Sequence, residues 1–244
     1  YANSTTYTEK DMIPNSISTT KGYRDINEII WGIIPNCIYN QRYYYQVGEY
    51  NSTLSQLFSF IYHPKIGNNT KTNIIIFGDM GAASADQGHL IENYIPSINT
   101  TNLIYKDLKN GIVDEIYHIG DISYAIGFES EHEWFLDQIE KVSSQVAWNV
   151  AQGNHERDYP NSGSLLGFTN DCGGEIGIPT LKIYQSKDYY SNNIGNIHII
   201  IINTEISFNH TSKQYKLLIN DLENINKKNT PLVIIGGHRP MYVD

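Results

Sequence analysis

The sequence from Glu115 to Tyr124 reads EIYHIGDISY and decides the fold class. A mostly apolar run of strand length ends at Ile119, and Gly120 then permits a tight turn. Asp121 follows directly, at the position where a buried strand would end. Open α/β sheets bind their ligands at that edge. The stretch therefore predicts a buried strand whose carboxyl end carries a functional carboxylate.

The same arrangement recurs along the chain after residue 72. Apolar runs of strand length alternate with longer mixed segments, which is typical of layered α/β domains. Besides Glu115–Ile119, the predicted strands are Asn73–Phe77, Val146–Ala151, Ile197–Ile202 and Leu232–Ile235. The spacing of apolar residues predicts helices over Glu131–Val142 and Ser212–Ile225. We expect both helices to pack on the core, with Trp134 on the inner side of the first.

Polar residues follow four of these strands, each directly or closely after a glycine. The set comprises Asp79, Asp121 with Tyr124, Asn154 with His155, and His238. A single residue of this kind is more often a turn or helix-cap residue. Four strand ends that carry such side chains together favour a metal site. The carboxylate, amide, imidazole and phenol groups include no thiolate, and this set suits iron, zinc, manganese or magnesium.

Two of these residues narrow the prediction. Asp121 stands between the other groups, and a carboxylate in that place is able to bridge two metal ions about 3.5–4 Å apart. A tyrosine hydroxyl titrates near about pH 10, so only a strongly Lewis-acidic ion would hold Tyr124 ionised at neutral or acid pH. The tyrosine therefore indicates ferric iron at one of the two positions.

The first 66 residues have a different pattern. Short β-type runs separated by turn residues extend over Glu28–Ile34, Arg42–Val47 and Leu57–Tyr62. Three short strands do not close a sandwich by themselves. We therefore expect residues 1–66 to be the C-terminal part of a β-sandwich domain. Residues 67–72 are the expected polar linker, and residues 73–244 form the second domain.

Composition and charge exclude several classes of function. The formal net charge of −9, without a cluster of Lys and Arg, argues against nucleic acid as a partner. No apolar run approaches the roughly 18 residues of a membrane helix, so we expect no membrane span. Cys37 and Cys172 lie too far apart for a thiolate zinc site, and their pairing stays open. Weak support for secretion comes from the glycosylation sequons, at Asn3, Asn51, Asn68, Asn99 and Asn209.

Four short motifs resemble, in order, the first four metal motifs of the purple acid phosphatases, which are dinuclear metallophosphoesterases. They are Gly78-Asp79-Met80-Gly81, Gly120-Asp121-x-x-Tyr124, Gly153-Asn154-His155-Glu156 and Val233-x-x-Gly-Gly-His238. In most members of that superfamily the first motif is D-x-H and the second lacks the tyrosine. Here Gly81 stands where the histidine would be and Tyr124 is present, which is the mark of the purple enzymes.

The resemblance extends over nearly the whole chain, from about Tyr7 to the end. Among its further stretches are Gly22–Asp25, Tyr43–Gly48 and Cys172–Glu175, which are similar to the large, plant-type members. Those members carry a fibronectin-type-III-like β-sandwich before an α/β metallophosphoesterase domain of sheets flanked by helices. Their fifth metal motif, G-H-x-H, does not occur in this sequence. The resemblance therefore implies that the motif lies beyond Asp244 and that the chain is a fragment.

The resemblance also implies a role for each site residue. Asp79 and Tyr124 would bind a ferric ion, and Asp121 would bridge the two metals. Asn154 and His238 would bind a divalent ion, which is zinc, iron or manganese. Asn154 would also touch the phosphate of the substrate.

His155 would lie beside the ligands, where it hydrogen-bonds phosphate or helps to protonate the leaving group. The implied activity is hydrolysis of phosphate monoesters by metal-bound hydroxide, as in an acid phosphatase. Two alternatives stay open: a related phosphohydrolase that acts on diesters, pyrophosphates or nucleotides, and a non-catalytic descendant. The partners that the resemblance implies are small phosphorylated substrates and a second copy of the chain in a homodimer, and the protein would be a secreted or endolysosomal glycoprotein.

Overall fold

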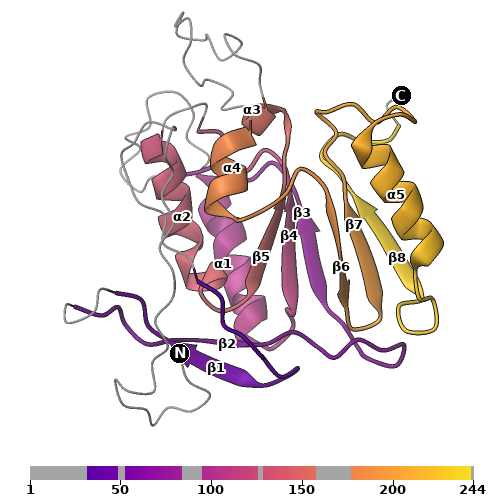
Figure 1. Cartoon of the computed structure of the whole chain (residues 1–244). Helices are drawn as coiled ribbons and strands as arrows, with labels where there is room; N and C mark the ends of the chain where they lie inside the picture. Colours follow the sequence, from indigo (N-terminus) through magenta and orange to yellow (C-terminus); the bar gives the residue numbers. More distant parts are fainter. Residues whose placement is uncertain (1–31, 49–52, 84–94, 126–128, 158–176, 243–244) are drawn as a thin grey trace, which may run out of the picture.

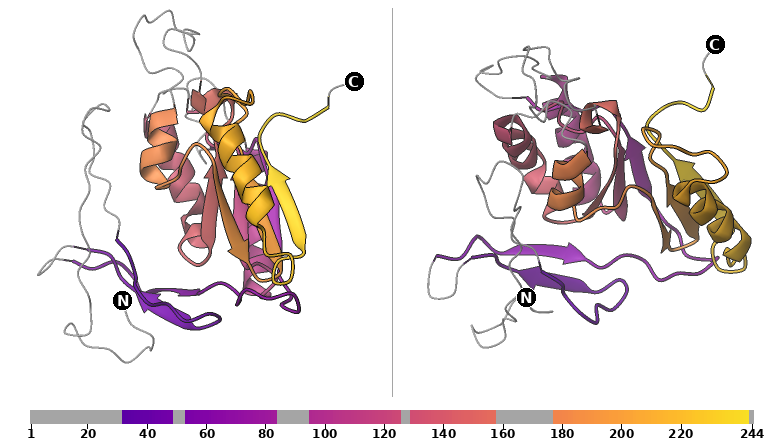
Figure 2. Two further views of the ribbon diagram at one scale, coloured as in Figure 1. Left: turned by 45° about the vertical axis from the view of Figure 1, so that its right-hand side comes forward. Right: turned by 45° about the horizontal axis from the view of Figure 1, so that its top comes forward.

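The computed structural model describes residues 32–48, 53–83, 95–125, 129–157 and 177–242. Residues 73 onward form two β-sheets that face each other, with helices on the outer side of each (Figures 1 and 2). The first sheet has the order β3-β4-β5 and the second β6-β7-β8. The strands are β3 Ile74–Phe77, β4 Glu115–Ile119, β5 Ala147–Ala151, β6 Tyr190–Ile194, β7 Ile197–Ile201 and β8 Leu232–Gly236.

Successive side chains of β4 point to opposite faces of the first sheet, and this alternation explains the layering. Its neighbours in the first sheet are both parallel, so β4 is the central strand and has no exposed face. Ile116 packs toward the helices α1 (Pro96–Lys109) and α2 (Glu129–Ser143). Tyr117 points the other way, into a cluster with the isoleucines of β7. One strand therefore joins the two cores of the domain.

The second sheet is covered on its outer side by α5 (Lys213–Asn224), which begins after the Ser212 side-chain cap. β6 and β7 are antiparallel, whereas β8 runs parallel to β7. His198 of β7 contacts Asp221 of α5 through a hydrogen bond of 3.0 Å. Two short helices complete the fold, α3 over Asn154–Arg157 and α4 over Ile178–Ile183.

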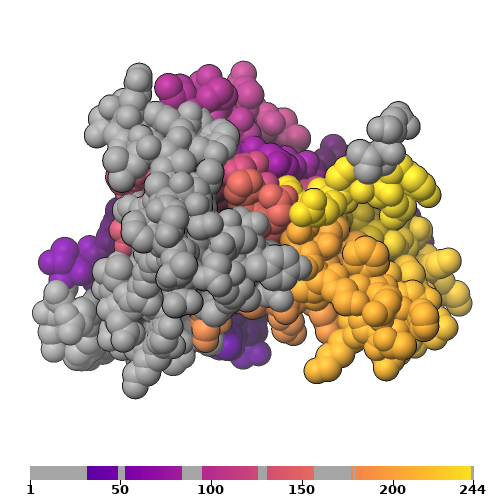
Figure 3. Space-filling view, turned by 90° about the horizontal axis from the view of Figure 1, so that it is seen from above, coloured from indigo at the N-terminus to yellow at the C-terminus, as the bar shows by residue number. Residues whose placement is uncertain are grey.

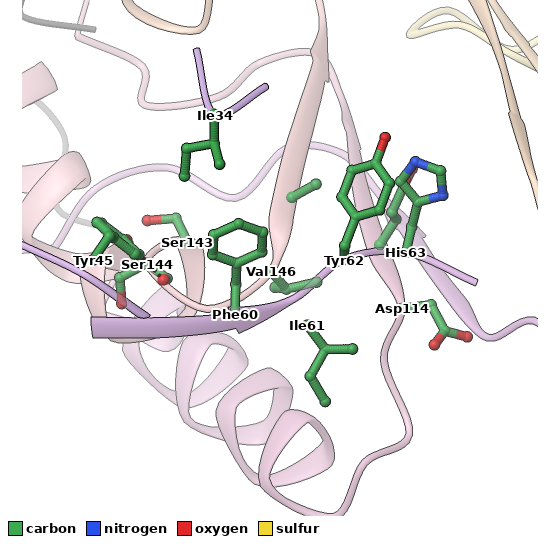
Figure 4. A pocket seen from close by; sticks show the side chains of 12 residues that line it. Ile34, Tyr45, Phe60, Ile61, Tyr62, His63, Asp114, Ser143, Ser144 and Val146 are labelled. Carbon is green, nitrogen blue, oxygen red and sulfur yellow. Dashed lines mark hydrogen bonds between the residues drawn. The ribbon is translucent and has the colours of Figure 1, made fainter. Parts of the chain in front are cut away.

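Before this domain lies a hairpin of two antiparallel strands, β1 (Arg42–Tyr45) and β2 (Phe58–Ile61). It lies under the ends at which β4 and β5 begin (Figure 1). The hydroxyl of Tyr45 donates to the carbonyl of Ser144, just after α2, at 2.8 Å. Between hairpin and sheet remains a cavity of about 340 Å³, which Phe60, Tyr62 and Val146 help to line (Figure 4).

The five predicted strands of the second domain are confirmed within one residue at each end, as are the two predicted helices within two. The runs Arg42–Val47 and Leu57–Tyr62 contain β1 and β2, while Glu28–Ile34 lies mostly outside the described residues and its last three residues form no strand. The fibronectin-like identity of residues 1–66 stays a prediction. The sequence did not reveal α1, β6, α3 and α4.

One packing expectation, that for Trp134, needs correction. Trp134 is 36% exposed, because the turns of α2 that contact the sheet bury Phe135 and Ile139 instead. The predicted linker, residues 67–72, contacts the turn between β6 and β7, because the Gly67 N–H donates to the Gly195 carbonyl at 2.9 Å. Among the described residues, no helix combines the length and apolarity that crossing a membrane requires.

Candidate metal centre

The parallel strands bring their carboxyl ends to one edge of the molecule. Phe77 of β3 pairs with His118 of β4, which pairs with Val150 of β5, so the three strands end side by side. Seen from above in Figure 3, the segments that follow β3, β5 and β8 meet at this edge. The loops after these strands therefore face a common point, as open α/β sheets require for a ligand site.

The backbone at this edge adopts an unusual conformation. Asp79, Asp121 and Tyr124 have φ angles of 57°, 49° and 55°, in the left-handed region that residues other than glycine seldom occupy. Such residues cost on the order of 1–3 kcal/mol each and cluster at functional sites. Here the left-handed turns direct each side chain away from its strand and toward the neighbouring loop. The strain is thus concentrated on three of the six predicted site residues.

Two carboxylates and an imidazole form the centre of the cluster. One ligand atom from each of Asp79, Asp121 and His238 lies within 4.8 Å of the others. His238 Nε2 is 3.4 Å from Asp121 Oδ1, and His238 Nδ1 is 4.0 Å from Asp79 Oδ2. The first sheet supplies the two carboxylates and the second sheet supplies the histidine, so the site lies where the two sheets meet.

The surroundings of His238 fit a metal ligand. Its Nδ1 lies 3.2 Å from the carbonyl of Ile119, which accepts a hydrogen bond when Nδ1 carries the proton. Its Nε2 then faces Asn154 Oδ1 at 3.1 Å and the Asp121 carboxylate. These atoms all present lone pairs, so a cation among them would relieve their repulsion. When Nε2 is protonated instead, it donates a hydrogen bond to Asp121, and this bond raises the pKa of His238 against the effect of burial.

Asp121 is held in its ionised form. Burial acts to raise its pKa, but hydrogen bonds from His238 and from the His155 backbone, together with the charges of both imidazoles, outweigh burial and lower it. The His155 N–H donates to Asp121 Oδ1 at 3.0 Å, and His155 Nε2 lies 3.8 Å from Asp121 Oδ2. A buried carboxylate whose pKa is lowered in this way suits a shared ligand of two cations.

Tyr124 completes the same cluster. Its hydroxyl donates to Asp79 Oδ1 at 2.9 Å, and its ring lies 4.5 Å from the imidazole of His155. Burial, this hydrogen bond and the charge of Asp121 raise the pKa of Tyr124. The phenol is therefore protonated in the protein alone, and its ionisation requires a strong Lewis acid.

The structure thus brings together all six predicted residues: Asp79, Asp121, Tyr124, Asn154, His155 and His238. The donor set of two carboxylates, an amide oxygen, an imidazole and a phenol fits hard to borderline metal ions. One residue that the prediction did not single out, Glu156, is bound to the backbone of this site through its carboxylate. Its place directly after Asn154 and His155 was the available signal in the sequence.

Comparison with known proteins agrees with this geometry. The model of one family, described as calcineurin-like phosphoesterase, matches residues 72–244. "Probable inactive purple acid phosphatase 27" of Arabidopsis thaliana is 34% identical over 98% of this chain and 40% of its own length. A nucleotide pyrophosphatase/phosphodiesterase of Hordeum vulgare is 34% identical over 75% of this chain and 50% of its own length.

Among solved structures, the purple acid phosphatase PPD1 from yellow lupin (Lupinus luteus) seeds is similar with a TM-score of 0.70 and 34% identity. The match covers 83% of this chain and 37% of the lupin chain. The chain thus spans between about a third and a half of the length of these relatives.

Proposed function

Because the chain belongs to the calcineurin-like phosphoesterases and, within them, to the purple acid phosphatases, we propose that it binds two metal ions and hydrolyses phosphate monoesters. The observation that carries this proposal is the convergence of Asp79, Asp121 and His238, whose ligand atoms lie within 4.8 Å of one another. They come from three different loops, so the cluster is not an accident of one turn. Asn154 and Tyr124 add two neutral oxygen donors to the same point.

The contacts support the division of ligands that the resemblance implies. Asp79 and Tyr124, which are joined by a hydrogen bond, form the ferric side. Asn154 and His238, which lie 3.1 Å apart, form the side of the divalent ion, zinc, iron or manganese. Asp121 lies between them and is the bridge. When bound, the two ions supply Lewis-acid activation of water and neutralise the phosphate.

The protein groups have their own tasks in the reaction. The Asn154 side chain offers its oxygen to the ion and its NH₂ group to a phosphate oxygen. His155 lies against both Asp121 and Tyr124, within reach of a substrate at the centre. Its imidazole is placed to donate a hydrogen bond to phosphate or to the departing oxygen. The lowered pKa of Asp121 favours the charged form of the proposed bridge.

A second candidate activity is hydrolysis of diesters or pyrophosphates. The barley relative, which is named a nucleotide pyrophosphatase/phosphodiesterase, favours it. The names of several Arabidopsis relatives mark them as inactive, which makes a non-catalytic protein the third candidate. Substrate choice depends on loops around the metals more than on the ligands themselves.

One experiment separates the three candidates. The complete gene product is loaded with iron and zinc, analysed for metal, and assayed with an aryl phosphate, a bis-aryl phosphate and a nucleoside diphosphate. Faster hydrolysis of the aryl phosphate supports the monoesterase. Preference for either other substrate supports the second candidate, and bound metal without hydrolysis of any substrate supports the third. Failure to bind metal would reject the metal centre altogether.

The cellular setting is part of the same proposal. Secretion or an endolysosomal location would expose the sequons to glycosylation. Asn68, Asn99 and Asn209 lie on the surface of the described structure, where glycan attachment meets no obstruction from the core. A shift of the protein on gels after enzymatic deglycosylation would test this.

A further inference from the structure

The carboxylate of Glu156 joins two loops of the candidate metal centre. Its Oε2 accepts hydrogen bonds from the backbone N–H groups of Asp121, at 2.8 Å, and Gly153, at 2.9 Å. Its Oε1 accepts the N–H of Ile122 at 2.8 Å. Asp121 and Ile122 lie in the loop after β4, whereas Gly153 lies in the loop after β5. One side chain thus links the backbone before Asn154 to the backbone that carries Asp121.

These three N–H groups need an acceptor. The hydrogen-bonded pairing of β4 with β5 stops at Ile119 and Ala151, so these three N–H groups lie beyond the strands and have no strand partner. The chain turns at Gly120 and Asp121, whose φ angles are 98° and 49°. Glu156 itself is only 4% exposed, so water does not readily replace its carboxylate. A buried N–H without an acceptor is costly, and this carboxylate satisfies three at once.

The two loops are also in direct contact. A side chain at Gly153 would collide with the backbone and the carboxylate of Asp121. The His155 N–H in turn donates to Asp121 Oδ1 at 3.0 Å. Any movement of one loop would therefore displace a ligand carried by the other, and Glu156 fixes their separation.

We propose that Glu156 is a positioning residue that assembles the metal-binding geometry of Asp121 and Asn154 before any metal binds. This role concerns the same site as the proposed function, and it rests on that function only in taking metal ions as the ligand of the site. The hydrogen bonds that carry it exist within the protein alone. Glu156 also adds a fixed buried acid beside the shared carboxylate of Asp121.

Glu115, at the start of β4, provides a matched control. It is 7% exposed, at the opposite end of β4, and accepts hydrogen bonds from the Tyr117 hydroxyl at 2.6 Å and from the Asn149 side chain at 3.3 Å. Its hydrogen-bond partners among the described residues are side chains of β4 and β5, and not the loops of the metal centre. Glu115→Gln and Glu156→Gln therefore make the same chemical change, one at the start of β4 and the other in α3, beside the loop that follows β4.

The first measurement uses the metal-free wild-type protein, in its complete form. Hydrogen exchange at the amides of Asp121, Ile122 and Gly153 should be slowed to the level of the β4 and β5 amides. Exchange at the rate of open loops would overturn the proposal, whatever the variants do. This measurement needs no metal and no activity, so it tests the role of Glu156 separately from the proposed function. The proposed function fails if the wild-type protein binds no metal.

The second measurement is the dissociation constant for Zn²⁺ alone. Glu156→Gln places an NH₂ group against a backbone N–H, so we expect affinity to fall about 10–100-fold and exchange at the three amides to speed up about tenfold or more. Glu156→Asp, which keeps the charge on a shorter chain, should lie between. Glu115→Gln should leave Zn²⁺ affinity within about twofold of the wild type. Equal losses in the Glu115 and Glu156 variants, or wild-type affinity in Glu156→Gln, would overturn the proposal.

Discussion

The two ends of β4 contain buried carboxylates in opposite settings. At its start, which we call the hairpin end, Glu115 is held by side chains, and β1 and β2 pack below it (Figure 1). At its finish, the metal end, Asp121 has a left-handed backbone and touches two imidazoles. The comparison indicates that one end contributes packing whereas the other stores strain that the rest of the fold supports.

The difference has a consequence for mutations. Changes at the hairpin end should alter stability and leave chemistry intact, because no predicted ligand lies there. Changes of the predicted ligands at the metal end should alter chemistry strongly and stability little, because the strained turns and like charges there stabilise no fold by themselves.

The largest effect is expected for Asp121→Asn. The change removes the negative charge that the two cations would share, so both should be depleted. Activity should fall about 1,000-fold or more, beyond the roughly 10–100-fold typical of residues that only support ligands. Metal analysis and hydrolysis of an aryl phosphate by the complete protein provide the measurement.

Asp114→Asn, at the hairpin end, is the control for Asp121→Asn. Asp114 Oδ2 accepts the N–H of Asn73 at 2.7 Å, and asparagine keeps one oxygen in that place. We expect a loss of stability of about 1 kcal/mol and normal metal content. If Asp121→Asn keeps both metals, the bridging assignment is wrong.

Tyr124→Phe should have the next largest effect. It keeps the ring against His155 and removes the oxygen that would bind the ferric ion. Loaded with iron, the wild-type protein should absorb visible light by charge transfer from the phenolate, and the variant should lose this band and retain iron less well. Visible spectra with iron analysis decide the outcome.

Tyr190→Phe is the matched deletion of a buried hydroxyl. The Tyr190 hydroxyl donates to the carbonyl of Val150 at 2.9 Å, away from the ligands. This variant should keep the visible band and lose about 1 kcal/mol of stability. A colourless wild type, or an unchanged band in Tyr124→Phe, would place the protein among phosphoesterases that lack a tyrosinate ligand.

The sequence predicted which residues meet at the metal end, because this information is local. An apolar strand, a glycine and a polar residue are contiguous, and parallel pairing then brings the polar residues together. The contacts of Glu156 could not be predicted in this way, because its partners are backbone N–H groups that carry no residue-specific signal. Its role depends on how two loops meet in space.

Missed elements of the fold have equally specific causes. Helix α1 buries Ser97 and Thr101 beside Ile104, so its inner face shows no apolar periodicity. Strand β6, Tyr190–Ile194, is polar at three of its five positions and depends on pairing with β7. The two residues Gly195 and Asn196 between these strands were an overlooked hairpin signal.

A smaller effect, on stability alone, is expected for His118→Phe. His118 is fully buried, its ring stacks on Phe77 at 4.6 Å, and neither ring nitrogen has a hydrogen-bond partner among the described residues. Burial lowers the pKa of His118 to about 3. The unfolded chain therefore takes up a proton first as the pH falls below about 6.5, and the folded state loses about 1.4 kcal/mol per pH unit through this group until about pH 3.

Phenylalanine removes this dependence on pH. The metal-free His118→Phe variant should therefore be more stable than the wild type at pH 5, and its advantage in stability should be smaller at pH 7.5. Thermal unfolding at the two pH values tests it. His198→Phe is the control, since both His198 nitrogens are bonded, at 2.7 Å to Asn193 and 3.0 Å to Asp221, and its loss should destabilise. A His118 variant with the pH dependence of the wild type would contradict the assignment of a neutral buried histidine.

The smallest effect is expected at the hairpin end, for Tyr45→Phe. Burial, with the charge of Glu140, raises the pKa of Tyr45 to about 12, so the hydroxyl stays protonated and donates to the Ser144 carbonyl at 2.8 Å. Phenylalanine keeps the stack on Phe58, whose ring centroid is 5.4 Å away, and removes only that bond. We expect a loss of about 1 kcal/mol, seen as a fall in Tm of about 2–4 °C, with Zn²⁺ affinity and hydrolysis unchanged. A change in either of those two quantities would mean that the hairpin controls the metal loops through α2. The two ends of β4 would then be coupled, and the division between packing and chemistry would have to be abandoned.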